Sequence, residues 1–492
     1  MQWGVIIASV MTRLLACLLS LTLAITPTHA LDLNLPDLGD VAAAELSPRT
    51  ERRLGESIMQ EIRWQDPSYI DDAEIEEYVN QLGGRLVAAS SHPDGRFEFF
   101  VMRDPMINAF ALPGGYIGLH SGLILMAESE SELASVLGHE IAHVTQRHIA
   151  QLFGRHGQTS MVMLASLLLA ALAGAAGGGQ MGEAALAAGQ AGAIQSQLNY
   201  SRAFEREADR VGLQLLDRAG FDPRGMPGFF ARMQRTNRLY ESAAPGYLRT
   251  HPMTNERFTD MESRVAQMRY RQVLDSPEFG YVRAKLRATA VSPSDAVRRF
   301  EAAVNDHPDD AAQRYGLARA LLRAGRLDEA DAQLARVRGQ AQPSSFIEML
   351  DAEIAFARRD AGQAADILAA ARQTYPGNRA VRVAHIGAVL ESGQVQEAAR
   401  LARQGLESDR RDLRMWQALA RAEERLGRRT AYHRAQAEVY ALRGSLPAAI
   451  DQLERARQAA DGDFYDMSAV DARLRELKDE DRFRREEGLP RH

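Results

Sequence analysis

The 492-residue sequence contains a single cysteine, Cys17. It lies in an apolar run that follows Arg13, and a small residue, Ala30, ends the segment after this run. This order is typical of a secretory signal, so we expect residues 1–30 to be removed by cleavage after Ala30. The mature chain would then have no cysteine, which excludes disulfides and thiolate ligands. A metal ion would have to be held by histidine, aspartate or glutamate.

Two alternatives stay open at this end of the chain. The stretch LLAC, which ends at Cys17, resembles a lipoprotein acylation box, although almost no apolar core precedes the cysteine. Translation could also begin at Met11 instead of Met1, because apolar residues already occur between them.

The sequence also lacks a strong charge imbalance. Its net charge is −6, and residues of both signs are interspersed. A nucleic-acid-binding surface needs a basic patch or stripe. We therefore do not expect nucleic acid as a partner.

Long apolar runs are rare after the N-terminus, and residues 161–179 are the main exception. Alanine and glycine dominate the second half of this run, which makes insertion into a bilayer marginal. We favour a glycine-rich cover beside the functional site. The alternatives are a membrane span and a shallow peripheral contact with a membrane.

From about residue 292 onward, alanine, arginine, leucine and glutamate replace the strand-forming residues, and a period of 34 emerges. This period with small residues at fixed offsets is typical of tetratricopeptide repeats, whose units are helix-turn-helix pairs. A plain helical bundle is the alternative. Solenoids present concave surfaces, so this half is expected to bind another polypeptide. The positions that repeat are Ala330, Ala364 and Ala398, and, at the turn within a unit, Gly325, Arg359, Gly393 and Gly427.

The sequence of the first half predicts helices and a few short strands. Residues 50–90 have the pattern of amphipathic helices, 97–102 are rich in strand formers, and 107–124 predict two short strands around a Pro-Gly-Gly turn. Ser129 opens a helix with the spacing of a capping box, and we expect this helix to run to Phe153. The fold class is therefore α+β and mostly helical.

The predicted helix contains the motif His-Glu-x-x-His. His139 and His143 are four residues apart, so their side chains leave the same helix face within one turn and can share a metal ion. Glu140 is rotated about 100° from His139, where a carboxylate can take a proton from water at the metal without being a ligand. This spacing predicts a hydrolytic metal site.

A catalytic zinc site needs a third protein ligand. Four candidates are His120, His148, His251 and the acidic residues between 205 and 209. His148 would lie about 140° around an unbroken helix from His143. We therefore expect it to be a surface residue or an outer neighbour of a ligand. Glu205 and Asp209 are four residues apart, so one could bind the metal while the other orients a ligand histidine; an exposed salt-bridged face is the alternative for this segment.

Four segments together resemble a known family. They are similar to the zinc metallopeptidase family that includes HtpX and the CaaX prenyl endopeptidases, and most of all to its periplasmic β-barrel assembly-enhancing branch, in which tetratricopeptide repeats follow the protease. The resemblance covers about residues 50–270. The segments are NAFALPGGYI (108–117), GHEIAHV (138–144), SRAFEREADRVG (201–212) and RTHP (249–252).

The resemblance implies a domain organisation. We expect a zincin-type metalloprotease domain with a small β-sheet at 31–275, a linker at 276–291, the all-α tetratricopeptide solenoid at 292–480 and a polar tail at 481–492.

The resemblance also implies a role for each matching residue at the metal. His139, His143 and Glu205 would bind one Zn²⁺ ion per chain, and Glu140 would be the general base. Asp209 would orient a ligand histidine. His251 would be a regulatory fourth ligand that occupies the open metal position and holds the enzyme inactive; its alternative is an ordinary loop residue.

A β-strand that pairs with an extended substrate is implied as well. It would run from Asn108 to Gly115, with Asn108, Ala109, Phe110, Gly114 and Gly115 as its site residues.

The expected function is that of a periplasmic zinc endopeptidase in outer-membrane protein quality control. It would degrade misfolded or stalled β-barrel proteins, assist their assembly and contact the barrel-assembly machinery through its repeats, in association with the outer membrane. One alternative is a chaperone-like adaptor of that machinery in which proteolysis is secondary. Another is an integral membrane protease, which requires residues 161–179 to span a bilayer.

Overall fold

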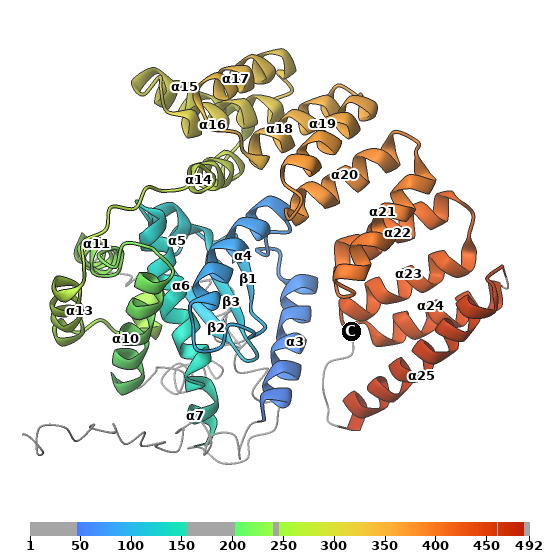
Figure 1. Cartoon of the computed structure of the whole chain (residues 1–492), viewed down its shortest axis with the longest axis horizontal. Coiled ribbons are helices and arrows are strands. Elements are labelled where there is room, and N and C mark those ends of the chain that lie inside the picture. The colour runs from blue at the N-terminus through green and yellow to red at the C-terminus, as the bar shows by residue number, and fades with distance from the viewer. Residues whose placement is uncertain (1–46, 155–201, 240–245, 460, 487–492) are drawn as a thin grey trace, which may run out of the picture.

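Helices dominate the computed structural model, which describes residues 47–154, 202–239, 246–459 and 461–486 (Figure 1). The predicted signal peptide, the apolar run at 161–179 and the end of the predicted tail lie outside these ranges. No helix within them combines the length and the apolar character needed to cross a bilayer.

A three-stranded sheet lies in the N-terminal half. Its strands are β1 (Glu98–Met102), β2 (Ala109–Leu112) and β3 (Tyr116–His120). Their order is β1-β3-β2, with β1 parallel and β2 antiparallel to the central β3. In the described part of the chain, β2 is therefore an edge strand.

The two faces of the sheet enter different cores, because successive side chains of a strand point in opposite directions. Phe99 and Val101 of β1 join the core that includes residues of α4 (Ala73–Ala88) and α6 (Glu130–Thr145). The alternate residues Phe100 and Met102 pack against α3 (Pro48–Gln65). The sheet is thus enclosed by helices on both faces, and α6 lies directly against it (Figure 1).

The predicted helix from Ser129 to Phe153 is interrupted. Ser129 caps α6 as expected, but α6 ends at Thr145 and a separate helix, α7, spans His148–Gly154. Arg147, between them, has a φ of 53°. This left-handed conformation costs a residue other than glycine about 1–2 kcal/mol. The prediction of one continuous helix was wrong because neither glycine nor proline marks the break.

Five further helices complete the N-terminal half. They surround α6 and continue its core on the side away from α3 (Figure 1). These helices are α5 (Ser121–Met126), α10 (Arg202–Arg218), α11 (Gly225–Leu239), α12 (Gly246–Thr250) and α13 (Asn255–Gln267).

Paired antiparallel helices then form an arc that curves around α4 and α3 (Figure 1). The four predicted turn positions, Gly325, Arg359, Gly393 and Gly427, have φ values of 74°, 64°, 86° and 68°. Each repeat unit thus turns at the residue that the period of 34 predicts, and the repeat fold is confirmed. The helices are α14 (Pro277–Thr289), α15 (Pro293–Asp306), α16 (Ala311–Arg323), α17 (Leu327–Gln340), α18 (Ser345–Ala357), α19 (Ala361–Thr374), α20 (Arg379–Glu391), α21 (Val395–Ser408), α22 (Leu413–Arg425), α23 (Arg429–Leu442), α24 (Leu446–Ala459) and α25 (Phe464–Glu486).

A buried ionic network joins the solenoid to the start of α4. Lys285 of α14 lies 2.7 Å from Asp72 and also pairs with Glu74. Arg319 of α16 lies 3.5 Å from Glu74 and forms two 2.8 Å hydrogen bonds with Glu353 of α18. Residues 285, 319 and 353 are 34 apart, so equivalent positions of three consecutive units build this contact.

Later repeats also contact the N-terminal helices. Arg414 of α22 lies 3.1 Å from Glu76 of α4, and Arg411 lies 2.8 Å from Glu56 of α3. The solenoid is therefore attached to the first half at its start and again at α22.

The ionic network predicts a large effect of Glu74→Ala. This change leaves Lys285 and Arg319 buried with fewer acidic partners, so the free energy of unfolding should fall by about 3 kcal/mol, the lower end of the range for a broken buried pair because Asp72 still contacts Lys285. Urea titration followed by circular dichroism measures this effect. Glu397→Ala breaks an exposed pair with Arg400 and should change stability far less; equal losses in both variants would contradict the prediction.

Candidate metal centre

Helices α6 and α10 carry most of the predicted metal-site residues, and they cross at two glycines. A Cβ atom on Gly212 would lie 2.9 Å from the backbone nitrogen of His139 and 3.0 Å from the carbonyl carbon of Gly138. The two backbones are thus in direct contact, at a distance that leaves no space for a side chain. The crossing places Glu205 and Asp209 of α10 beside His139 of α6.

The structure brings four buried side chains together: His139, His143, Glu205 and His251. Each offers one ligand atom, and these atoms all lie within 4.8 Å of one another. His139 Nε2 lies 3.0 Å from His143 Nε2 and 3.5 Å from Glu205 Oε2. His251 Nδ1 lies 3.3 Å from His139 Nε2 and 3.0 Å from Glu205 Oε1.

These distances fit a tetrahedral metal site. Nitrogen and oxygen ligands about 2.0–2.2 Å from a zinc ion lie about 3.3–3.5 Å from one another in tetrahedral geometry. Three imidazoles and one carboxylate are also a donor set that a first-row transition metal accepts. The four residues present can therefore hold one such ion.

A buried carboxylate and a buried arginine support the cluster from behind. His139 Nδ1 lies 3.0 Å from Asp209 Oδ1, so a proton on Nδ1 faces Asp209 and leaves Nε2 directed at the cluster. Arg257 of α13 binds Asp209 with two 2.7 Å hydrogen bonds and lies 2.8 Å from Glu205. One guanidinium thus orients both buried acids of α10.

The local electrostatics favour the protonation states that metal binding requires. Burial raises the pKa of Glu205, but His251 and the hydrogen bond with His139 outweigh burial and hold that pKa well below its usual range. Burial and the neighbouring His139 lower the pKa of His143. At neutral pH the Glu205 carboxylate is charged and the His143 imidazole is neutral, as ligands must be.

Unlike Glu205 and His143, His139 does not have the protonation state of a metal ligand before metal binds. Burial lowers the pKa of His139, but hydrogen bonds with Asp209 and Glu205 outweigh burial and raise the pKa to about 9. A metal ion that binds Nε2 must therefore displace a proton, so metal binding releases protons at neutral pH.

Glu140 stands next to the cluster without joining it. Its side chain is fully buried, and burial raises its pKa although His251 and His139 act in the opposite direction. The Nε2 atom of His251 lies 3.5 Å from Glu140 Oε1. His251 therefore contacts the cluster through Nδ1 and Glu140 through Nε2.

Helix α12 holds His251 in this position. The ring of Tyr247, one turn earlier, stacks on His251 with centroids 4.7 Å apart. The N–H of Tyr247 donates to the carbonyl of Ile107 at 3.0 Å, and the N–H of His251 donates to the carbonyl of Tyr247 at 2.8 Å. The helix is thus hydrogen-bonded to the residue that precedes Asn108 and the edge strand β2.

The residues of the predicted substrate strand lie in two different surroundings. Asn108, Ala109 and Phe110 lie at the end near α12. Gly114 and Gly115 form the turn to β3 with φ values of 77° and 90°, and this turn packs on α3, where Arg52 donates to the carbonyl of Gly114 at 2.6 Å. The role of β2 in binding substrate remains a prediction.

The structure decides between the two alternatives for His148. It is buried, and its Nδ1 lies 2.9 Å from Nδ1 of His143, so it is an outer neighbour of the cluster and not a surface residue. The break at Arg147 changes the direction of the chain before His148 and so removes the 140° separation expected on a continuous helix. His120, another candidate, lies 3.5 Å from Asp104 and is not part of the cluster.

Sequence reasoning missed Arg257 and Tyr247. A signal for Arg257 exists, because two buried acids on one helix need a cation, and Arg257 follows His251 by six residues. No comparable signal marks Tyr247, whose position depends on how α12 packs against Phe230 and His139.

A buried cluster of three histidines and a glutamate, with the Glu140 carboxylate beside it on α6, is the arrangement of a metallopeptidase. The profile of peptidase family M48 matches residues 73–265, and a tetratricopeptide-repeat profile matches residues 292–353 and 355–422. The chain belongs to peptidase family M48 and is a metalloendopeptidase that carries tetratricopeptide repeats.

Two bacterial relatives align with both halves of the chain, and a mitochondrial one aligns with a shorter part. The sequence is 34% identical to the putative beta-barrel assembly-enhancing protease of Vibrio cholerae over 452 residues, which cover 90% of this chain and 92% of the relative. It is 33% identical to the beta-barrel assembly-enhancing protease of Escherichia coli K12, over 90% of this chain and 91% of the relative. The mitochondrial metalloendopeptidase OMA1 of Arabidopsis thaliana is 32% identical over 41% of this chain and 39% of its own length.

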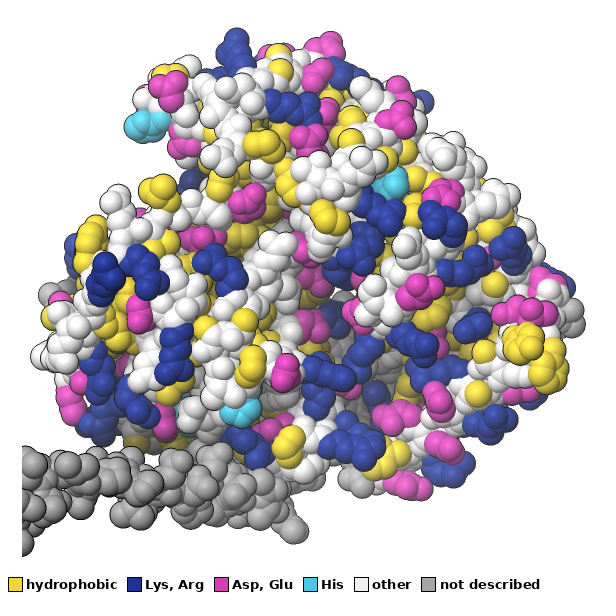
Figure 2. All heavy atoms as spheres, viewed as in Figure 1, with side chains coloured by type: hydrophobic (Ala, Val, Ile, Leu, Met, Phe, Trp, Pro, Cys, Tyr) yellow, Lys and Arg dark blue, Asp and Glu magenta, His cyan; other side chains and the backbone are white. Residues whose placement is uncertain are grey.

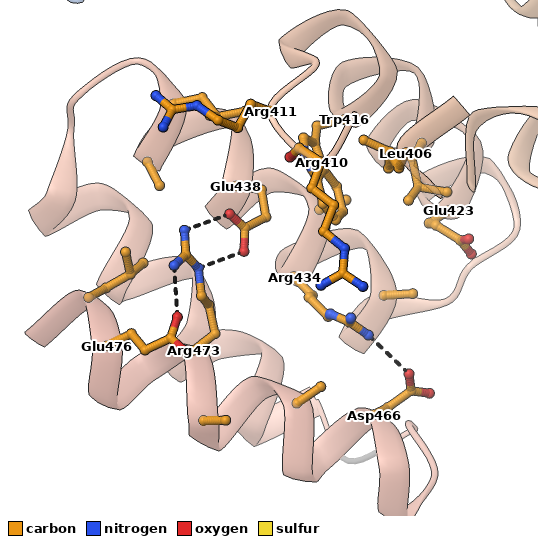
Figure 3. A pocket seen from close by; sticks show the side chains of 18 of the residues that line it. Leu406, Arg410, Arg411, Trp416, Glu423, Arg434, Glu438, Asp466, Arg473 and Glu476 are labelled. Atoms are coloured by element: carbon orange, nitrogen blue, oxygen red, sulfur yellow. Dashed lines mark hydrogen bonds and ion pairs between the residues drawn. The ribbon is translucent and has the colours of Figure 1, made fainter. Parts of the chain in front are cut away.

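A second candidate site is a cavity of about 1390 Å³ between α3 and the last repeats. Arginine and acidic side chains line it in nearly equal numbers, and basic side chains also border the hollow between the two halves on the face shown in Figure 2. Arg473 bridges Glu438 and Glu476, Arg434 reaches toward Asp466, and Trp416 adds an aromatic surface (Figure 3).

The glycine crossing predicts opposite effects for two glycine-to-alanine changes. Gly212→Ala forces α10 away from α6, so the free energy of unfolding should fall by about 1–3 kcal/mol, and metal affinity should fall because Glu205 moves from His139. Gly84→Ala, at an exposed helical position with open space around it, should raise stability by about 0.5–1 kcal/mol. Urea titration and metal binding of both variants test this, and a Gly212→Ala protein that is as stable as wild type would refute the tight crossing.

Proposed function

We propose that this metalloendopeptidase is a zinc enzyme in which His139, His143 and Glu205 bind the metal. The observation that supports the proposal most strongly is the buried group of three such ligands with Glu140 beside it on α6. Zinc is favoured because it accepts two histidines and one carboxylate and leaves a fourth position for the reaction.

The surrounding residues perform the remaining chemistry. A bound zinc ion supplies a Lewis acid for the scissile carbonyl and lowers the pKa of water. Glu140 accepts the proton of the attacking water and returns it to the leaving amine, and its raised pKa suits that exchange. Asp209 keeps the proton of His139 on Nδ1, so that Nε2 remains a ligand.

Substrate binding is assigned to β2. An extended peptide can add to an edge strand through backbone hydrogen bonds, which provide affinity without strict sequence preference. The strand is antiparallel to β3 and lies against α6, so a peptide along it would pass near the metal centre.

We further propose that His251 is a regulatory fourth ligand, which gives the metal centre a closed conformation. The contacts of His251 with the ligand cluster and with Glu140 support this proposal, because a substrate carbonyl and water would need the same place. Helix α12 is hydrogen-bonded to Ile107, which precedes β2. A movement of α12 that withdraws His251 would therefore free both the metal position and the approach to β2.

The biological role follows from the relatives that share both halves. We propose that the enzyme acts in the periplasm after cleavage at Ala30, degrades misfolded or stalled outer-membrane barrel proteins and assists their assembly. The solenoid would contact substrate or the assembly machinery, and the cavity beside α3 suits a polar extended segment because it offers both charges and Trp416.

An adaptor with secondary proteolysis is a second candidate. The cavity beside α3 favours it, because charged side chains and Trp416 there could hold a polypeptide without any part played by the metal centre.

The ligand assignment predicts different defects for two substitutions. Glu205→Ala should lose most of the bound zinc, because two histidines alone form an incomplete site. Glu140→Gln should keep zinc but lose about 10²–10⁴-fold in peptide hydrolysis, because the base is absent. Metal analysis and casein hydrolysis of the purified proteins measure both effects. Full zinc occupancy in Glu205→Ala would refute its assignment, and full cellular function of Glu140→Gln would favour the adaptor role.

The closed conformation predicts that His251→Ala increases hydrolysis. The substitution vacates the fourth position but leaves the three proposed ligands and Glu140 in place. Initial rates with an unstructured substrate should rise, and His251→Ala combined with Glu140→Gln should be inactive, which excludes a contaminating protease. A fall in the rate of the single variant would show that His251 assists the reaction instead of blocking it.

A further inference from the structure

His143 has two ring nitrogens in different surroundings. Its Nε2 lies 3.0 Å from Nε2 of His139 and 3.5 Å from Glu205, so Nε2 is the atom directed at the metal position. Its Nδ1 lies 2.9 Å from Nδ1 of His148. A neutral imidazole that uses the Nε2 lone pair for a metal carries its proton on Nδ1. His143 must therefore donate from Nδ1.

His148 is arranged to accept that proton. Two Nδ1 atoms 2.9 Å apart can form a hydrogen bond when one of them is protonated, so His148 offers an unprotonated Nδ1 and carries its own proton on Nε2. That Nε2 lies 3.4 Å from a carboxylate oxygen of Glu207. The ring of Phe204 stacks on His148 at 4.4 Å with an interplanar angle of 13°, which fixes the plane of the imidazole.

We propose that His148 is a positioning residue, which accepts the Nδ1 proton of His143 and so fixes the tautomer and orientation of this ligand. The inference rests on the proposed role of His143 as a metal ligand. It assigns to His148 the part that Asp209 plays for His139.

The two ligand histidines then have different supports, and charge explains the difference. Asp209 is a buried anion that needs Arg257 beside it. A second buried anion behind His143 would need another cation, because an unpaired buried charge is costly. A neutral imidazole provides the acceptor without this cost, and its link to Glu207 leads to a residue that is 38% exposed in its side chain.

The break between α6 and α7 makes this contact. On a continuous helix, His148 would face away from His143. Arg147 adopts a φ of 53°, and α7 then begins at His148 itself. The conformational cost at Arg147 is thus associated with a contact at the metal centre, as is common for strained residues near functional sites.

Two substitutions of His148 distinguish the effect of its hydrogen bond from the effect of its packing. His148→Phe keeps an aromatic ring on Phe204 but removes the acceptor, whereas His148→Asn places an amide oxygen near the position of Nδ1 but removes the ring. His385→Phe, in the solenoid, is the control for loss of a buried imidazole. The dissociation constant for Zn²⁺ is measured on the metal-free full-length chains by competition with a fluorescent chelator.

His148→Phe should weaken Zn²⁺ binding by about 10–100-fold, the range for loss of an outer hydrogen bond to a ligand. His148→Asn should recover most of that affinity, and His385→Phe should match wild type. Wild-type affinity in His148→Phe would overturn the inference, and so would equal losses in the Phe and Asn variants, because both results assign no role to the acceptor. A wild-type chain that binds no Zn²⁺ would instead refute the proposed function.

A measurement on the wild-type chain does not depend on whether the His148 variants fold. In long-range ¹H–¹⁵N spectra of the zinc-loaded chain with ¹⁵N-labelled histidine, His143 should carry its proton on Nδ1 and His148 on Nε2. The reverse assignment for His148 would overturn the inference even if no variant folds.

Discussion

The metal centre depends on the direct contact of two helix backbones. Gly138 and Gly212 have no side chains, so α6 and α10 approach until a Cβ on Gly212 would touch the backbone of His139. At that distance the short acidic side chains of Glu205 and Asp209 reach both ring nitrogens of His139. Any wider crossing would separate the acids of α10 from the histidines of α6.

Such close approach concentrates charge in a buried space. Glu140, Glu205 and Asp209 are all buried there, and Arg257 contacts two of them. Buried charges are costly unless they are paired. A divalent cation would balance the remaining negative charge, which is a physical reason to expect metal here beyond the donor set. His251 contacts Glu205 and Glu140 in the same buried space.

The solenoid is part of the same assembly and not a separate appendage. Lys285 and Arg319 bury their charges against the start of α4, and α4 packs on the sheet whose edge strand is β2. The cavity near Trp416 includes residues of α3, which packs on the other face of that sheet. A partner bound in the cavity would therefore touch both halves of the enzyme at once.

Periodicity and spacing made much of this protein predictable. The 34-residue period located the turns of the repeats, because each unit buries the same face against its neighbours. Strand-forming residues located β1. The spacing of His139, Glu140 and His143 indicated a shared metal, because a helix brings residues four apart to one face. Family resemblance then pointed to Glu205, Asp209 and His251. These are local patterns or short motifs, and they can be recognised in the sequence without knowledge of distant contacts.

Other features were decided by tertiary structure alone. The left-handed conformation of Arg147 has no signal in the sequence, because contacts made elsewhere in the fold offset its conformational cost. On a continuous helix, His148 would face away from His143. Arg257 and Tyr247 join the site because α12 and α13 fold back across α6 and α10. The sequence by itself determined which helix carries the histidines and how the repeats turn, since both depend on the geometry of a single helix or unit. The orientation of each side chain in the cluster and the position of His251 depend on contacts between residues as far as 112 apart in the sequence, which only the packed chain brings together.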